Sequence, residues 1–252
     1  MSELRGIYTL WKREVLRLVR EKTRLISSVV TPVLWLVIFG TGLGASMGLR
    51  AGYNYQAFLY PGIIGQTLLF TAMFMGISVI WDKQFGFMKE ILVAPVSRLS
   101  IFIGKMLGVG TNSMLQGLIV LALGFFIGIP MSVSLVAETI PLMILVTIGL
   151  VCIGLIIASV LNSLENFGLI MTFVNMPMFF LSGALFPVAT LPDWLKWVFY
   201  INPLTYGVDA IRAVTMGSAW QTILPMWQTL LIIVAFDVVA VLVGSYTFAR
   251  TK

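Results

Sequence analysis

The sequence predicts an all-α membrane protein with six transmembrane helices, and three observations support that fold class. Of its 252 residues, 59% are hydrophobic and only 10% are charged, whereas about a quarter are charged in soluble domains. The mean hydropathy is +1.01. Six stretches are free of charge or nearly so, and each can hold the ~20 residues that a transmembrane helix needs. We expect an N-terminal amphipathic interfacial helix before the first span and an outer-side re-entrant helical pair between spans five and six.

Residues 1–24 are assigned to the interfacial helix. Its apolar residues recur at helical spacing, at Ile7, Trp11, Val15 and Leu18, and seven Lys and Arg residues occupy much of the remainder. A Trp on one face and basic residues on the other are typical of a helix that lies in the membrane interface. A nucleic-acid-binding arm is the alternative, but the apolar face leads directly into a spanning segment. We therefore expect the lipid bilayer, and no nucleic acid, as its partner.

Residues 25–252 are treated as one six-span transmembrane domain. Polar or turn-forming residues separate its six apolar windows, and only Asp237 interrupts the last of them. The windows are Leu25–Leu49, Ala51–Trp81, Met106–Ala137, Thr139–Leu164, Asn166–Pro192 and about Pro225–Ala249.

The basic residues predict the orientation. Thirteen of the sixteen Lys and Arg residues fall in the N-terminal arm, in residues 82–105 and at the C-terminus; the others are Arg50, Lys196 and Arg212. Because Lys and Arg concentrate in cytoplasmic loops, both termini are expected on the cytoplasmic side of the inner membrane. The turn at 162–166 should lie on that side too, although it contains neither Lys nor Arg.

The composition argues against most catalytic chemistry. The chain has no His and one Cys, Cys152, in an apolar stretch, so a metal centre, an intrachain disulfide and a His base are excluded. No Walker A sequence and no Ser/His/Asp set occurs, so ATP binding by a P-loop is excluded. We expect no catalytic, cofactor-binding or metal-binding residue in this chain.

The charged stretch from 82 to 105 is the segment around which the chain is organised. It joins two apolar windows, and its middle is amphipathic, with Phe85, Phe87 and Met88 near Glu90. The residue before a proline resists helical geometry, so a helical turn should end at Ala94-Pro95. We expect a cytoplasmic helix that binds a cleft in a partner protein. The alternative is a second interfacial helix that rests on lipid.

The segment from 187 to 225 should lie on the outer side. It contains Pro192, Pro203 and Pro225, and it is rich in Trp and Tyr, which favour the headgroup level. We expect two short helices, broken at Asn202-Pro203, that lie on the outer membrane face or dip into it.

Two sequence motifs resemble the ABC-2 family of export permeases, in its daunorubicin-resistance and nodulation-factor type. The first is GFMKEILVAPVSR (86–98), followed by Gly104-Lys105, and it resembles the cytoplasmic signature of the family. The second is FLSGALFP (180–187), then Leu191-Pro192 and NPLTYGVDAIR (202–212), which resembles the outer end of span five and the re-entrant helices. One departure is Asp82-Lys83, where family members often carry Glu-Arg.

The resemblance implies the permease subunit of an ATP-driven exporter. Two copies would pair with two copies of a separate ABC-type ATPase, which would bind ATP-Mg, and the cargo would be an amphipathic drug, lipid or glycan. It assigns ATPase coupling to Phe85, Gly86, Phe87, Lys89, Glu90, Leu92, Pro95 and Arg98. It assigns the re-entrant motif to Pro187, Pro192, Asn202, Pro203, Tyr206, Asp209 and Arg212.

Three residues within the apolar windows have two interpretations each. Asp237 lies near the middle of span six, where a carboxylate costs about 2.5–3.5 kcal/mol, so it should face protein or water. It could form a hydrogen bond to Ser, Thr or Asn, or it could serve as the ion or proton site of a secondary transporter. Asn175 and Pro177 in span five could line a pathway or form a static bend. Besides an exporter subunit and a secondary transporter, a third possible class of function is a membrane scaffold or assembly factor without transport.

Small residues at i and i+4 also occur at the two ends of span three. They are Gly104-x-x-x-Gly108 and Gly124-x-x-x-Gly128. Such spacing allows close helix approach, and we expect internal packing rather than a subunit interface.

Overall fold

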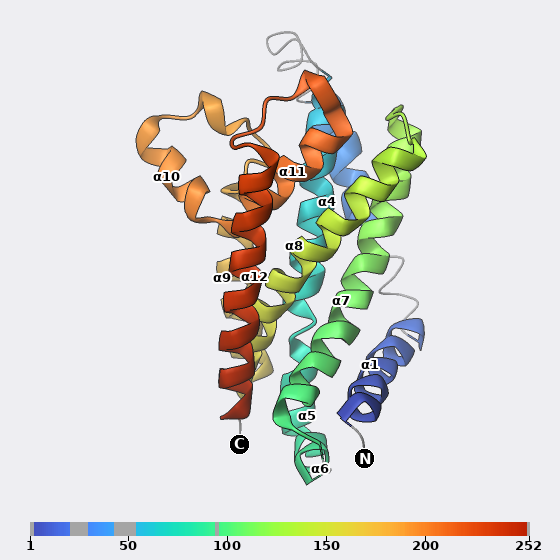
Figure 1. Cartoon of the computed structure of the whole chain (residues 1–252), viewed down its shortest axis with the longest axis vertical. Coiled ribbons are helices and arrows are strands. Elements are labelled where there is room, and N and C mark those ends of the chain that lie inside the picture. The colour runs from blue at the N-terminus through green and yellow to red at the C-terminus, as the bar shows by residue number, and fades with distance from the viewer. Residues whose placement is uncertain (1–2, 21–29, 43–53, 94–95, 251–252) are drawn as a thin grey trace.

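The computed structural model describes residues 3–20, 30–42, 54–93 and 96–250, and the side chains of Lys89, Leu92 and Val93 also lie outside this description. Within these ranges the chain is helical and contains no strand. Long helices run along one axis, with α6 at one end of the bundle and α10 at the other (Figure 1). We call these the α6 end and the α10 end. The start of α1 and the end of α12 both lie at the α6 end (Figure 1).

The helices follow one another with short connections. Their bounds are α1 Glu3–Arg20, a π-helical turn η1 Trp35–Phe39 inside the apolar helix Val30–Gly42, α4 Tyr55–Phe74, α5 Ile77–Gln84, α6 Phe87–Val93, α7 Arg98–Leu123, η2 Gly124–Ile127, α8 Val133–Val160, α9 Leu164–Phe180, η3 Val188–Thr190, α10 Asp193–Ile201, α11 Pro203–Met216, η4 Gly217–Ala219 and α12 Met226–Ala249.

In the part of the chain that the structure describes, four segments are long and apolar enough to cross a membrane. They are Tyr55–Gln84, Arg98–Ile127, Val133–Val160 and Met226–Ala249. The first predicted span is described only as the apolar helix Val30–Gly42, and its flanks fall outside the described residues. The fifth corresponds to α9, which has 17 residues. The all-helical class is therefore confirmed, and the full set of six spans stays a prediction.

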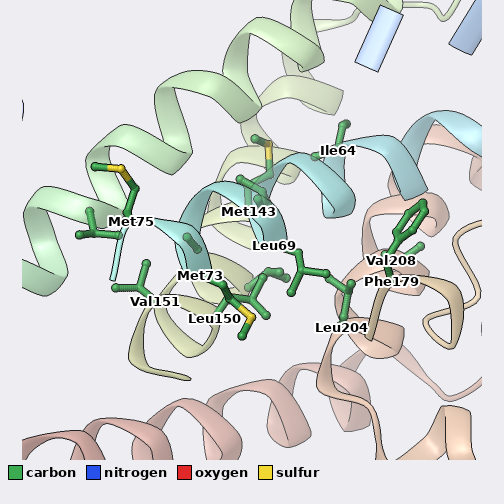
Figure 2. Packing of buried hydrophobic residues seen from close by; sticks show 14 of the residues in the cluster. Ile64, Leu69, Met73, Met75, Met143, Leu150, Val151, Phe179, Leu204 and Val208 are labelled. Atoms are coloured by element: carbon green, nitrogen blue, oxygen red, sulfur yellow. The ribbon is translucent and has the colours of Figure 1, made fainter. Parts of the chain in front are cut away.

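Helix α4 forms the centre of the bundle. It is apolar on all sides, which is typical of a helix surrounded by others. It packs against α7, α8, α9 and α11. Figure 2 shows Leu69 and Met73 of α4 beside Leu150 of α8 and Leu204 of α11. The other helices are arranged around this core.

Two glycines allow the central helices to touch at a break between α4 and α5. The helix is interrupted at Met75 and Gly76, and α5 continues beyond it. A Cβ on Gly76 would lie 2.6 Å from the Gly154 carbonyl oxygen of α8, and a Cβ on Gly154 would lie 2.8 Å from that of Met73. Any larger residue would push the two backbones apart.

Helix α1 packs along α7, and small residues make the approach possible. A Cβ on Gly104 would lie 2.8 Å from Leu10 Cβ, and one on Gly108 would lie 2.5 Å from Glu14 Cβ. The Gly104-x-x-x-Gly108 pair therefore serves packing within the chain, as expected. The buried face of α1 contains Gly6, Leu10, Glu14 and Leu18. The sequence analysis had placed Ile7, Trp11 and Val15 on the apolar face, and these are only half-buried.

The glycines of α7 provide a matched pair of substitutions. Gly108→Ala places a methyl group against Glu14, and we expect it to lower the free energy of unfolding by about 1–3 kcal/mol. Gly110→Ala adds the same methyl group where the nearest heavy atom is 3.9 Å away, so it should be neutral or slightly stabilising. Thermal unfolding of both variants in detergent measures the difference. Equal melting temperatures would show that α1 is not held tightly against α7.

Candidate coupling site

Helix α6 forms the tip of the α6 end (Figure 1). Two aromatic side chains are exposed there, one at the start of α6 and one in the turn before it. Gly86, with φ +80°, occupies the left-handed region and turns the chain from α5 into α6. Phe85 and Phe87 are 70% and 51% exposed, and Glu90 is exposed too. Met88 is 2% exposed and fixes the inner side of α6. The structure thus gives α6 an exposed surface of two rings and a carboxylate.

The remaining residues assigned to coupling are placed less completely. Pro95 and the side chains of Lys89 and Leu92 lie outside the described residues. Arg98, at the start of α7, donates from Nη1 to the Ala249 carbonyl oxygen at the end of α12. A cation beside the last carbonyls of a helix is stabilising. Arg98 therefore connects the exit of the α6 loop to the last helix.

The start of α1 is attached to the same loop. The Ser97 amide and hydroxyl donate to the Glu3 carboxylate at 3.0 and 2.9 Å, and the Ser97 hydroxyl caps α7 by accepting from the Ser100 amide. Hydrogen bonds from Ser100 and Ser97 hold the pKa of Glu3 below its usual value. Val96 packs on Gly6 of α1. The loop, α1 and α7 therefore meet directly behind α6.

A buried charge cluster lies between α1, α5 and α7. We use this name for Arg13, Glu14, Arg17, Asp82 and Lys105. The Asp82 carboxylate accepts from both Arg13 and Lys105, which come from different helices. Glu14 lies 3.3 Å from Arg13, 3.6 Å from Arg17 and 3.6 Å from Lys105. Each acid is therefore shared by at least two cations.

Burial makes this charge cluster energetically important. The side chains of Glu14, Asp82 and Lys105 are at most 1% exposed, while Arg13 and Arg17 remain about one third exposed. Removing one partner from a buried ion pair typically costs 3–5 kcal/mol, because the other charge is left uncompensated. Three cations face two carboxylates, so the cluster keeps one excess positive charge on its exposed side.

Lys83, next to Asp82 in sequence, stabilises the end of α8. Its Nζ donates to the carbonyl oxygens of Ala158, Ser159 and Leu161, which terminate that helix. The last carbonyls of a helix have no partner within it, so a cation there satisfies them. The 162–166 turn has no Lys or Arg of its own, and Lys83 brings a positive charge to it.

At the α10 end, the residues of the re-entrant motif hold the backbone. Arg212 is buried; it donates to the carbonyl oxygens of Phe58, Gly183 and Ala184, and its guanidinium lies 3.9 Å from the centroid of the Phe58 ring. Asp209 accepts from the Trp220 indole at 2.8 Å and from the Ile223 amide at 2.9 Å. These contacts join α11 to α4, to the turn after α9 and to the segment before α12.

Asn202 ends α10 and caps α11. Its Nδ2 donates to the carbonyl oxygens of Met178 and Leu181, and its Oδ1 accepts from the Leu204 amide. Pro203 is the first residue of α11, and the Tyr206 hydroxyl donates to the Tyr200 carbonyl oxygen. The residues brought together here are Asn202, Pro203, Tyr206, Asp209 and Arg212, whereas Pro187 and Pro192 precede the short helices η3 and α10. Their contacts are structural ones within the chain.

Asp237 does not form the expected hydrogen bond. It is buried in α12, and among the described residues no Ser, Thr or Asn side chain donates a hydrogen bond to either carboxylate oxygen. A Cβ on Gly149 of α8 would lie 2.5 Å from Oδ1, and apolar residues line the small space around the carboxylate. The described residues that line this space include no Ser, Thr or Asn. That expectation was therefore wrong.

Asn175 and Pro177 lie in α9, next in sequence to Met176, which lines a cavity. Asn175 is fully buried, and neither of its amide atoms has a hydrogen-bond partner among the residues that the structure describes. Pro177 lies within the last turn of α9. A cavity of about 350 Å³ separates this part of α9 from α4 and from the helix at 30–42. Its polar lining includes Gln66 and a hydrogen-bonded pair, Thr71 and Gln116.

The charge cluster is the feature that sequence reasoning missed. Asp82 and Lys105 had been counted only as loop charges, and Glu14 was not singled out. One signal was available: Glu14 is the only acid between Arg5 and Arg20. A single acid among the five basic residues from Arg5 to Arg20 favours a specific partner.

The fold and these sites define a class, a polytopic helical membrane protein with a buried charge cluster near one end of its bundle. Comparison with known proteins identifies the family. Residues 5–216 match the ABC-2 type transporter family, and the chain belongs to it. It is 31% identical to ycf38 of Cyanophora paradoxa over 95% of this chain and 87% of that protein. It is also 25% identical to the inner membrane transport permease YadH of Escherichia coli (strain K12), over 84% of this chain and 83% of YadH.

A further relative is nodulation protein J of Rhizobium leguminosarum bv. viciae, 26% identical over 84% of this chain and 80% of that protein. The chain is thus a transport permease, the membrane subunit of an ABC transporter, and such permeases work with ABC ATPase subunits. The ATP-hydrolysing part of the transporter is not found within these 252 residues.

Proposed function

We propose that this permease is the membrane half of an exporter that moves an amphipathic drug, lipid or glycan out across the cytoplasmic membrane. Two copies pair with each other and with two ATPase subunits. The α6 end is cytoplasmic and carries both termini, and the α10 end faces outward. The observation that carries the proposal is the exposed surface of α6, two aromatic rings beside a carboxylate, fixed to the bundle by Met88.

The exposed surface of α6 suits a cleft in an ATPase. An amphipathic helix in a groove is a recurrent mode of protein recognition, and aromatic residues dominate the energetics of such contacts. The chain that follows α6 is held by the Ser97–Glu3 and Arg98–Ala249 contacts. ATP-driven movement of the ATPases therefore acts on α1, α7 and α12 together. The cavity beside Asn175 and Pro177 provides space in which α9 moves against α4 during transport.

A secondary transporter that uses Asp237 is the second candidate. Its supporting observation is a buried carboxylate to which no Ser, Thr or Asn side chain of the described chain donates a hydrogen bond. Against it, the space around Asp237 is small and apolar, and no second acid lies in it. The described residues contain no group of His, Cys, Asp and Glu that could hold a metal ion.

The coupling surface is tested by charge reversal. Glu90→Lys should weaken binding of the ATPase by about tenfold or more, because charge reversal leaves the partner group of Glu90 unpaired. Phe87→Asp should weaken it by a similar factor, because it places a carboxylate in an apolar contact. Glu165→Lys is the control, since Glu165 is an exposed acid at the start of α9, at the same end of the bundle. Co-purification with the ATPase and cargo-stimulated hydrolysis in liposomes are the measurements. If both variants bind the ATPase and export cargo as the wild type does, the coupling proposal is wrong and α6 is an interfacial helix that rests on lipid.

Asp237→Asn separates the two candidate functions. In the exporter, the substitution removes an unpaired buried charge, so export and its pH dependence should stay unchanged and the melting temperature should not fall. The measurement is transport by the reconstituted complex between about pH 6 and about pH 8, roughly the physiological range. Loss of transport in a variant that folds and binds the ATPase normally would favour the secondary carrier.

A further inference from the structure

The exposed side of α1 carries a basic hollow that the coupling proposal does not use. It has a volume of about 320 Å³ and is lined by Arg13, Leu16, Arg17 and Arg20. The three arginines recur at i, i+4 and i+7, so they lie along one face of α1. This face is distinct from the buried face, which contains Leu10, Glu14 and Leu18.

The charge cluster positions two of these arginines. Arg13 is bound to Asp82 and Glu14, and Arg17 lies 3.6 Å from Glu14 and 5.9 Å above the Trp81 ring. Both stay about one third exposed. Arg20 has no ion-pair partner in the described part of the chain, and it adds to the excess cation of the cluster. The hollow therefore combines pre-ordered guanidinium groups with uncompensated positive charge.

The surroundings indicate what kind of anion fits. Leu16 lines the hollow and is 46% exposed, and Val19 and Tyr8 are exposed on the same helix. A guanidinium group can form two parallel hydrogen bonds to phosphate oxygens. On a basic interfacial helix, the exposed apolar side chains contact the acyl chains of the lipid. We propose that this hollow binds the phosphate of an anionic phospholipid, with the acyl chains against the exposed apolar side chains of α1. The occupied site links lipid to the charge cluster behind α6.

The test uses the purified full-length permease and native mass spectrometry with added phosphatidylglycerol. Arg17→Gln and Arg20→Gln should each weaken retention of this lipid about fivefold, and the double variant about thirtyfold, since each removes a guanidinium that donates to the phosphate oxygens. The control is Arg5→Gln with Lys12→Gln, which removes two exposed charges from the same helix outside the hollow. The control should retain the lipid as the wild type does.

Three results would overturn the proposal. The first is an equal loss of phosphatidylglycerol from the control, which would indicate general attraction by a basic helix. The second is equal retention of phosphatidylcholine, which would indicate a site that does not select anionic lipid, or displacement of the lipid by inorganic phosphate, which would indicate a site for free phosphate. The third is a double variant that keeps the lipid and loses the ATPase, which would make the hollow a protein contact. Arg20→Gln alone guards against misfolding, because Arg20 lies outside the charge cluster.

Discussion

The buried charge cluster is the interaction on which the arrangement at the α6 end depends. Two carboxylates, Glu14 and Asp82, are removed from water, and this is tolerable only because cations from α1 and α7 surround them. The cluster also selects one alignment of α1, since a shift along α7 would move Glu14 away from Lys105 and from the space above Gly108. Small residues permit the approach, and the ion pairs fix its register. An isolated interfacial helix would have no reason to bury a glutamate.

The two ends of the bundle are held by different chemistry, with an apolar helix between them. At the α6 end, ion pairs and Lys83 join helices through side chains; at the α10 end, Arg212 and Asn202 bind backbone carbonyl oxygens. Between them, α4 packs through close glycine contacts at its break with α5. In the proposed exporter, a push on α6 reaches α1, α5 and α7 as one unit, and the cavity between α4 and α9 supplies the space for the proposed movement.

Local rules predicted much of this fold, and the pairing of distant charges is where they failed. Charge-free windows matched the long helices, and proline chemistry placed the break at Asn202-Pro203, because both depend on neighbouring residues. The Asp82–Lys105 and Asp82–Arg13 pairs join residues 23 and 69 positions apart, so they depend on how α1 docks. Likewise Arg98 and Lys83 serve as helix-end partners, which no local pattern indicates. Asp237 faces Gly149 because packing, and not hydrogen bonding, decides its surroundings.

The coupling free energy between Asp82 and Lys105 tests the central claim most directly. A double-mutant cycle with Asp82→Asn and Lys105→Met, followed by equilibrium unfolding in detergent, measures it. Each single variant should lose about 3–5 kcal/mol, and the double variant should lose less than their total by about 1–3 kcal/mol. The exposed pair Asp193 and Lys196 provides the comparison, with an expected coupling below about 1 kcal/mol. If the losses in free energy of unfolding at Asp82 and Lys105 are additive, so that their coupling free energy is no larger than that of the exposed pair, the account is contradicted.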